Sequence, residues 1–112
     1  MTDQPRTVVT EYFRRVSAKD PAIAELFALD ASLVGLGTTV TGRDAIAEFY
    51  RESLESASPS PTVVGALMVD GSRVATEIVI ALTGMAPLHV IDLFEVNDGL
   101  INSLTYFLSD HS

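Results

Sequence analysis

Three short turn sequences divide the second half of the chain into four apolar segments. The turns lie at 70–72 (Asp-Gly-Ser), 83–84 (Thr-Gly) and 97–99 (Asn-Asp-Gly), and the segments cover 62–69, 73–82, 85–96 and 100–108. Connections this short join antiparallel neighbours, because a parallel connection needs a dozen or more residues. The second half is therefore predicted to form an antiparallel meander of four strands.

The first half has the apolar spacing of helices. One helix is predicted over about 5–17, and a short second one starts at Asp20-Pro21, which suits a helix cap and first turn, with Ile23, Leu26 and Phe27 inward. A third follows Gly42 and ends at the Pro- and Ser-rich loop 56–61, and one or two short, bent strands are expected within 33–40. These patterns predict an α+β fold in which three N-terminal helices pack on one face of a curved, mainly antiparallel sheet. The 112 residues are expected to form a single domain, 1–112.

Charge and composition exclude several functions. Seven basic against fifteen acidic residues give a net charge of -8, which repels nucleic acid and anionic membrane surfaces, so neither is an expected partner. The chain has no cysteine and only two histidines, His89 and His111, which excludes thiolate chemistry and an all-histidine zinc site within one chain. We expect no metal and no cofactor. The polar N-terminus and the absence of a long apolar run favour a cytoplasmic location.

One acidic residue lies on the apolar face of a predicted strand. With a period of two, Asp92 shares a face with its neighbours Leu88, Val90, Phe94 and Val96. An ionised carboxylate is costly to bury, so Asp92 should be protonated, paired, or placed in a cavity that uses it. The opposite face is unusually apolar for a solvated sheet and predicts a homodimer. Its apolar members are Ile91, Leu93, Ile101 and Phe107.

Four local sequences resemble a known family. They are VVTEY at 8–12, LFALDA at 26–31, EFY at 48–50 and IDLF at 91–94. Together with the order of elements they are similar to the bacterial Δ5-3-ketosteroid isomerases, within the nuclear transport factor 2-like and SnoaL-like superfamily. The resemblance implies a cone-shaped α+β fold that binds a steroid-sized hydrophobic ketone or phenol.

The resemblance also implies roles for individual residues. Tyr12 and Asp92 match the two groups that donate hydrogen bonds to the ligand oxygen in an oxyanion hole, and Tyr50 matches a tyrosine that supports Tyr12. The neutral state of the acid is part of what the family implies. The remaining ligand-binding residues are expected to be Phe49, Ile78, Ile80, Val90, Phe94, Leu104 and Tyr106. Tyr106 stands where a small cavity residue is expected, so it should narrow the pocket or add a hydroxyl.

The family's general base is missing from this sequence. Its position falls at Gly35, and no residue from Ala31 to Arg43 is acidic. General acid and base groups contribute roughly 10²–10⁴-fold to rates, so Δ5-3-ketosteroid isomerase activity is expected to be weak or absent. An aspartate at Gly35 is expected to raise that activity.

Two alternatives remain open from the sequence. In one, the chain is a polyketide cyclase-like or hydratase enzyme in which an ionised Asp92 is the base. In the other, the fold is a non-catalytic module for small-molecule binding or dimerisation. The protonation state of Asp92 separates a donor from a base.

Overall fold

The computed structural model describes residues 4–35, 37–56, 60–84 and 86–108. Two α-helices, one 3-10 helix and six strands make up this part of the chain. In order they are α1 (Gln4–Ser17), the 3-10 helix η1 (Pro21–Leu26), β1 (Phe27–Gly35), β2 (Thr38–Thr41), α2 (Arg43–Ser56), β3 (Ser60–Asp70), β4 (Arg73–Ala81), β5 (Leu88–Asn97) and β6 (Leu100–Leu108).

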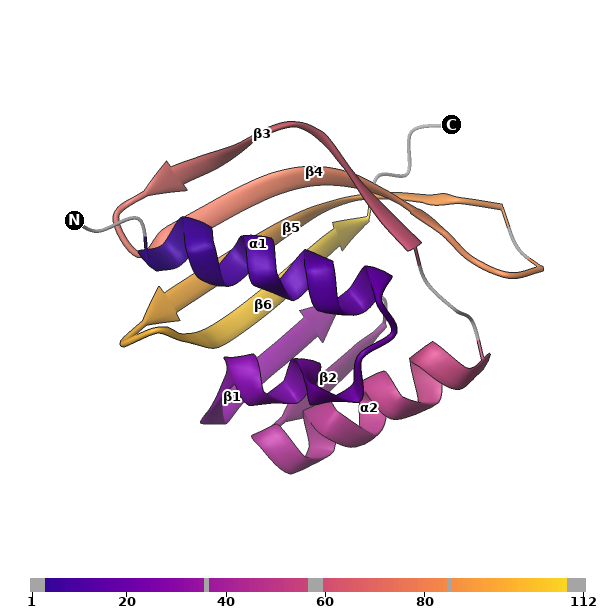
Figure 1. The fold of residues 1–112 in the computed structure, drawn as a ribbon, viewed down its shortest axis with the longest axis horizontal. Coiled ribbons are helices and arrows are strands. Elements are labelled where there is room, and N and C mark those ends of the chain that lie inside the picture. Colours follow the sequence, from indigo (N-terminus) through magenta and orange to yellow (C-terminus); the bar gives the residue numbers. More distant parts are fainter. Residues whose placement is uncertain (1–3, 36, 57–59, 85, 109–112) are drawn as a thin grey trace.

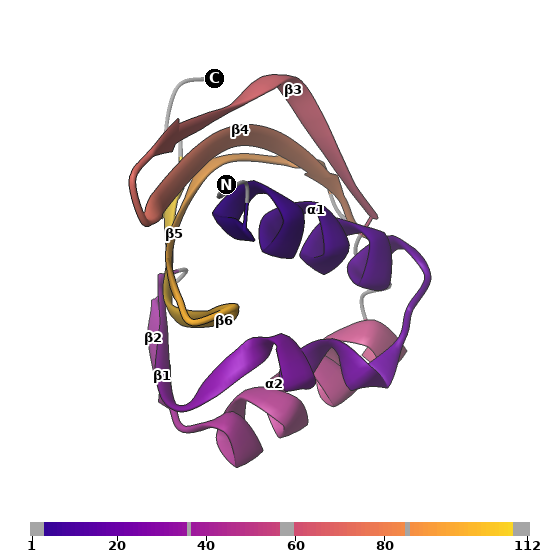
Figure 2. The ribbon, with the colours of Figure 1, turned by 60° about the vertical axis from the view of Figure 1, so that its left-hand side comes forward.

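The six strands form one sheet in the order β2-β1-β6-β5-β4-β3. The meander of β3 to β6 is antiparallel, as predicted, and β1 pairs with β6 in parallel. All helices lie on one face of the sheet (Figures 1 and 2). The sheet curves strongly around α1, and α2 lies below α1 in the view of Figure 1. The α+β class and the curved, mainly antiparallel sheet are therefore confirmed.

The predicted count of three N-terminal helices is not confirmed. The expected first and third helices correspond to α1 and α2, whereas the second is a six-residue 3-10 helix. Asp20 caps η1 by accepting a hydrogen bond from the amide of Ala22 at 2.9 Å, and Pro21 occupies its first turn. Phe27, expected within that helix, instead begins β1 and is fully buried.

Two strand assignments also differ from the prediction. Strand β1 begins at Phe27, well before the expected stretch 33–40, and β5 begins at Leu88, not at Met85, which lies outside the described residues.

Ile101, expected on the outer face, is fully buried. The reason is an irregularity in the pairing of β5 with β6, which places Ile101 opposite the buried Val96 and reverses the alternation.

Each α-helix buries one apolar stripe against the sheet. In α1 the buried residues are Val8, Val9, Tyr12 and Val16, and in α2 they are Ile46, Tyr50 and Leu54. Both tyrosines therefore point toward the interior from separate helices. Neither α-helix is long and apolar enough to cross a membrane, over the residues described.

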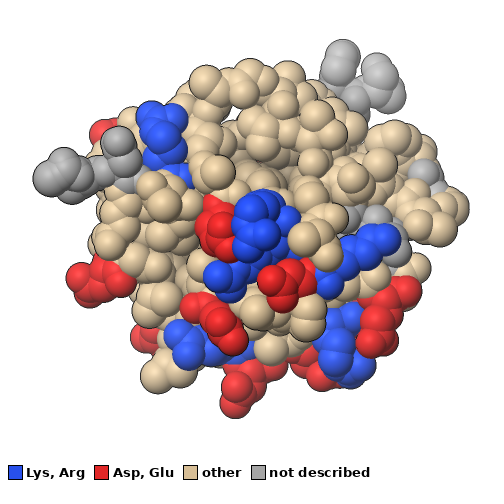
Figure 3. All heavy atoms as spheres, viewed as in Figure 1, with Lys and Arg blue, Asp and Glu red and all other residues tan. Residues whose placement is uncertain are grey.

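Charged side chains on the helical face alternate in sign. Lys and Arg lie next to Asp and Glu around α1 and α2 (Figure 3). Glu11, for example, pairs with Arg14 at 2.6 Å and with Arg15 at 2.7 Å. On this face the basic side chains are therefore interspersed with acidic ones.

Candidate functional site

Asp92 lies at the centre of a row of polar residues across three strands. It pairs with Thr76 on β4 and with Tyr106 on β6, so the three residues lie side by side in the sheet. Asp92 and Thr76 are fully buried, which confirms the predicted inward position of Asp92. Neither carboxyl oxygen of Asp92, nor the hydroxyl of Thr76, has a hydrogen-bond partner among the described residues.

Burial controls the charge of Asp92. Because its carboxyl has lost contact with water, the pKa rises from an ordinary value of 3.8 to about 8. No cation or hydrogen-bond donor within the described part of the chain offsets this effect. Asp92 is therefore a neutral carboxylic acid at pH 7, able to donate its proton in a hydrogen bond.

Three tyrosine hydroxyls, from α1, α2 and β6, meet in one cluster. The hydroxyl oxygens of Tyr12 and Tyr50 are 2.7 Å apart, those of Tyr50 and Tyr106 are 2.8 Å apart, and those of Tyr12 and Tyr106 are 3.1 Å apart. Burial is the main cause that raises the pKa of all three above the ordinary value of 10. All three remain neutral hydroxyls, and each has one proton to donate.

Aromatic packing fixes the ring of Tyr12. Its centroid lies 5.0 Å from that of Phe13 and 5.2 Å from that of Phe94, both in edge-to-face contacts. Phe27 makes a third such contact at 6.2 Å. The three contacts therefore hold the Tyr12 hydroxyl at a defined point within the tyrosine cluster.

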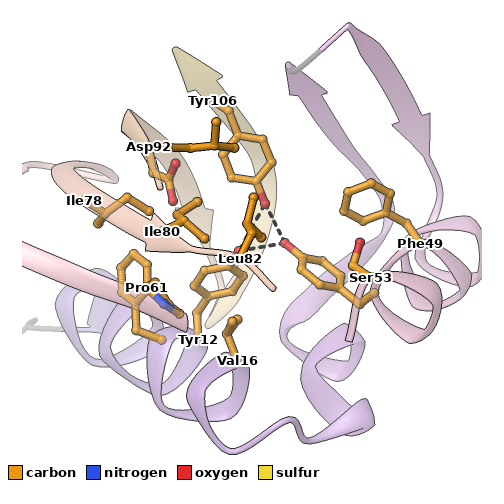
Figure 4. A pocket seen from close by; sticks show the side chains of 13 residues that line it. Tyr12, Val16, Phe49, Ser53, Pro61, Ile78, Ile80, Leu82, Asp92 and Tyr106 are labelled. Carbon is orange, nitrogen blue, oxygen red and sulfur yellow. Dashed lines mark hydrogen bonds between the residues drawn. The ribbon is translucent and has the colours of Figure 1, made fainter. Parts of the chain in front are cut away.

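A cavity of about 120 Å³ opens between α1, α2 and the sheet. The carboxyl of Asp92 reaches its wall among Ile78, Ile80 and the ring of Tyr106 (Figure 4). The polar groups on the wall are Asp92, the three tyrosines and Ser53, and the rest is apolar. The apolar lining consists of Phe13, Val16, Phe49, Pro61, Ile78, Ile80, Leu82 and Leu88.

The structure brings most of the proposed site residues together. Tyr12, Tyr50 and Asp92 all line the cavity, as do four of the expected ligand-binding residues, namely Phe49, Ile78, Ile80 and Tyr106. The other three, Val90, Phe94 and Leu104, are fully buried and are not among its lining residues. Tyr106 points inward, where its ring forms part of the cavity wall and its hydroxyl joins the tyrosine cluster.

Gly35 does not have room for a side chain. Its φ angle is +136°, and a Cβ there would lie 2.6 Å from the carbonyl oxygen and 2.8 Å from the Cβ of Tyr106. Strand β1 approaches β6 this closely because residue 35 is a glycine. The structure therefore argues against the expectation that an aspartate at Gly35 would supply a base, because it would displace β6.

Sequence reasoning missed Thr76 and half of the cavity lining. Thr76 is found only when the register of β4 against β5 is known, since it occupies the buried face directly opposite Asp92. Leu82 and Leu88 flank a connection between strands, and Pro61 lies at the start of β3. Positions near strand ends carry no periodic signal that points to a cavity.

No group of three or more His, Asp or Glu side chains is placed to hold a metal ion within the residues that the structure describes. The hydrogen-bond donors Asp92 and Tyr12 both line the mainly apolar cavity.

The fold matches solved structures of several proteins. A candidate ketosteroid isomerase from Kribbella flavida is 27% identical, with a TM-score of 0.85, and the match covers 99% of this chain and 82% of that one. A candidate polyketide cyclase from Sinorhizobium meliloti is 25% identical, with a TM-score of 0.81, covering 89% and 93%. An LEH-like epoxide hydrolase from M. tuberculosis, 20% identical with a TM-score of 0.85 over 96% and 84%, shares the fold.

A search of curated proteins finds no match for the chain. The profile of the SnoaL-like domain, in contrast, matches residues 9–104, a span that contains Tyr12, Tyr50 and Asp92. The resemblance noted from the sequence is thus confirmed at the level of the superfamily. The chain belongs to the SnoaL-like domain family and has the nuclear transport factor 2-like fold.

Proposed function

We propose that the protein binds a small hydrophobic ketone or phenol by its oxygen and stabilises negative charge on that oxygen. The observation that carries the proposal is the buried carboxyl of Asp92, which has no hydrogen-bond partner among the described residues and lines the same apolar cavity as Tyr12. A buried polar group without a partner costs roughly 1–3 kcal/mol of stability. A ligand oxygen that accepts a hydrogen bond from Asp92 would recover that cost on binding.

The two donors suit an oxygen that gains charge. At pH 7 the carboxyl of Asp92 is neutral, because its pKa is raised to about 8, and Tyr12 keeps its phenolic proton. Two fixed donors in a cavity of low polarity stabilise an enolate or phenolate oxygen more than they would in water. The site therefore fits the oxyanion role that its resemblance to ketosteroid isomerases implies.

One hydroxyl of the tyrosine cluster can donate to a ligand at a low cost in free energy. Three hydroxyls with three mutual contacts form a closed ring in which every proton is used. A ligand oxygen that accepts from Tyr12 replaces the longest contact, the one of 3.1 Å to Tyr106. Tyr106 then donates to Tyr50, and Tyr50 donates to Tyr12, so that the chain of hydrogen bonds ends on the ligand.

The site offers the oxyanion donors without a dedicated base. Asp92 is the only carboxyl among the described residues that line the cavity. When Asp92 serves as a donor, water must act as the base that removes a proton from the carbon next to the ligand carbonyl. We therefore expect slow enolisation and weak Δ5-3-ketosteroid isomerase activity.

One observation favours a second function. A pKa of about 8 is close to the pH at which a general base works best, and no hydrogen bond within the described part of the chain prevents Asp92 from accepting a proton. An ionised Asp92 would then remove a proton in a polyketide cyclase-like or hydratase reaction. The S. meliloti neighbour is described as a candidate polyketide cyclase.

Binding of 4-methylphenol and toluene to matched variants tests the proposal. The two probes have similar shapes but only the phenol carries an oxygen. We expect Asp92→Leu and Tyr12→Phe each to lower the affinity for the phenol by roughly three- to tenfold, the value of a buried hydrogen bond between neutral groups, and to change the affinity for toluene by less than about twofold. Calorimetry at pH 7 provides the measurement. Equal losses for both probes, or no loss in the double variant, would refute the oxygen site.

The Asp92→Asn variant distinguishes the role of Asp92 as a hydrogen-bond donor from its role as a general base. An amide still donates a hydrogen bond, so phenol affinity and the rate of deuterium exchange into a small cyclic ketone should fall by less than about tenfold. A base cannot be replaced by an amide, so a loss of two or more orders of magnitude in exchange, with phenol affinity intact, would favour the second function. No exchange in any variant, with phenol affinity as predicted, would indicate a binding module without catalysis.

A further inference from the structure

Tyr106 forms the wall of the cavity beside Asp92. It is the direct neighbour of Asp92 across β5 and β6, and its ring covers one side of the space that the carboxyl faces (Figure 4). A ligand oxygen bound to Asp92 must therefore lie against this ring. The size of Tyr106 decides how much of the ligand can follow the oxygen into the cavity.

The ring of Tyr106 is held on two sides. At its tip, the hydroxyl is 2.8 Å from that of Tyr50 and 3.1 Å from that of Tyr12. At its base, Gly35 allows β1 to lie so close that an added Cβ would be 2.8 Å from the Cβ of Tyr106. The ring therefore cannot swing away toward β1 without breaking both hydrogen bonds, and it acts as a fixed boundary.

The space that remains fits one ring. The cavity measures about 120 Å³. An apolar protein cavity of about 150 Å³ is known to hold benzene, whereas pockets for drug-sized ligands measure about 300–1,000 Å³. A four-ring ligand would have to leave most of its surface outside this cavity.

We propose that the ligand is a ketone or phenol with a single ring or similar bulk, and that Tyr106 is the residue that sets this limit. The inference rests on the proposed function, because it assumes that the ligand oxygen is bound by Asp92. It replaces the steroid-sized ligand that the family resemblance implies with a much smaller one. The ligand carries an oxygen that contacts Asp92, and it is apolar elsewhere because most of the cavity lining is apolar.

Three phenols of increasing size test the inference. The probes are 4-methylphenol, 2-naphthol and a four-ring steroidal phenol, measured by calorimetry or competition at pH 7. The wild-type protein should bind the single-ring probe more tightly than the four-ring probe by about tenfold or more. In Tyr106→Ala, the affinity for 2-naphthol should rise at least about tenfold relative to the affinity for 4-methylphenol. This is the effect expected from burying one further ring.

Two variants serve as matched controls. Tyr106→Phe keeps the ring and removes the hydroxyl, so it should keep the wild-type order of the three probes. Phe107→Ala removes a ring from the next position of β6, where the side chain is 53% exposed on the other face of the sheet, and should leave the order unchanged. Tyr106→Leu replaces Tyr106→Ala if the alanine variant does not fold, and it should shift the order in the same direction.

The outcomes separate this inference from the proposed function. Tightest binding of the four-ring phenol by the wild type, with that binding lost in Asp92→Leu, would overturn the size limit and leave the oxygen site intact. If the order of affinities for the three phenols is unchanged in the folded Tyr106→Ala or Tyr106→Leu variant, Tyr106 does not set the size limit. Phenol binding that does not depend on Asp92 would overturn the proposed function and this inference together.

Discussion

The Asp92→Asn substitution should change how the stability of the protein depends on pH. In the unfolded chain the carboxyl has its ordinary pKa of 3.8, and in the folded protein burial raises that pKa to about 8. Between these values the unfolded chain releases a proton that the folded protein retains. The wild-type protein therefore loses stability as the pH rises from about 4 to about 8, at about 1.4 kcal/mol per pH unit.

The size of the effect follows from the pKa difference. The interval from 3.8 to pH 7 corresponds to a loss on the order of 4 kcal/mol from this one group, a large part of the stability of a small domain. Asparagine has nearly the same shape and does not ionise. The difference in free energy of unfolding, Asn variant minus wild type, should therefore be small at pH 4, rise steadily, and level off above about pH 8.

Urea unfolding followed by circular dichroism between pH 4 and pH 9 measures this difference. Using the difference between two proteins cancels the titration of groups they share. Asp30→Asn, which removes an exposed carboxyl, is the matched control. A difference for Asp92→Asn that stays flat across this range would mean that Asp92 is not a neutral acid in the folded protein, and the account of the site would fail.

Three further predictions concern other residues. Thr76→Val should raise the free energy of unfolding in urea by about 1 kcal/mol, because it removes a buried hydroxyl that has no hydrogen-bond partner over the described ranges, and destabilisation would show that the hydroxyl is satisfied. Gly35→Asp should lower the melting temperature without a gain in isomerase activity, because its Cβ would clash with Tyr106, and a stable, more active variant would contradict that packing. The outer sheet face, with Phe107 53% exposed, should form a homodimer at micromolar concentration in sedimentation experiments, and Phe107→Arg should dissociate it. A wild-type monomer would refute the dimer.

The parts of the fold that the sequence predicts are those governed by local pattern. The turn Asn97-Asp98-Gly99 needs positive φ angles at its last two residues, which are +55° and +76°, and these residue types adopt them readily. The alternation around Asp92 is unbroken through β5, so its inward position could be predicted. The apolar run at 26–31 has no clear period, and the boundary between η1 and β1 within it could not be placed.

The parts that could not be predicted depend on long-range register. The parallel pairing of β1 with β6 joins segments about 70 residues apart, and no local pattern specifies it. The irregularity between β5 and β6 turned Ile101 inward, against the simple alternation. The meeting of Tyr12 and Tyr50 from two helices was implied only by the family resemblance, and Thr76 was found only through the register with Asp92.

The central claim is that Asp92 is a neutral acid that donates to a ligand oxygen. A ¹³C NMR titration of the aspartate carboxyls, with Asp92→Asn used to assign the signal, tests it most directly. We predict an apparent pKa of about 8 for Asp92 in the free protein and a higher value with bound 4-methylphenol, because a ligand oxygen that accepts a hydrogen bond from the protonated carboxyl stabilises this neutral form. An apparent pKa near the ordinary value of 3.8, or one that falls on binding, would contradict the account.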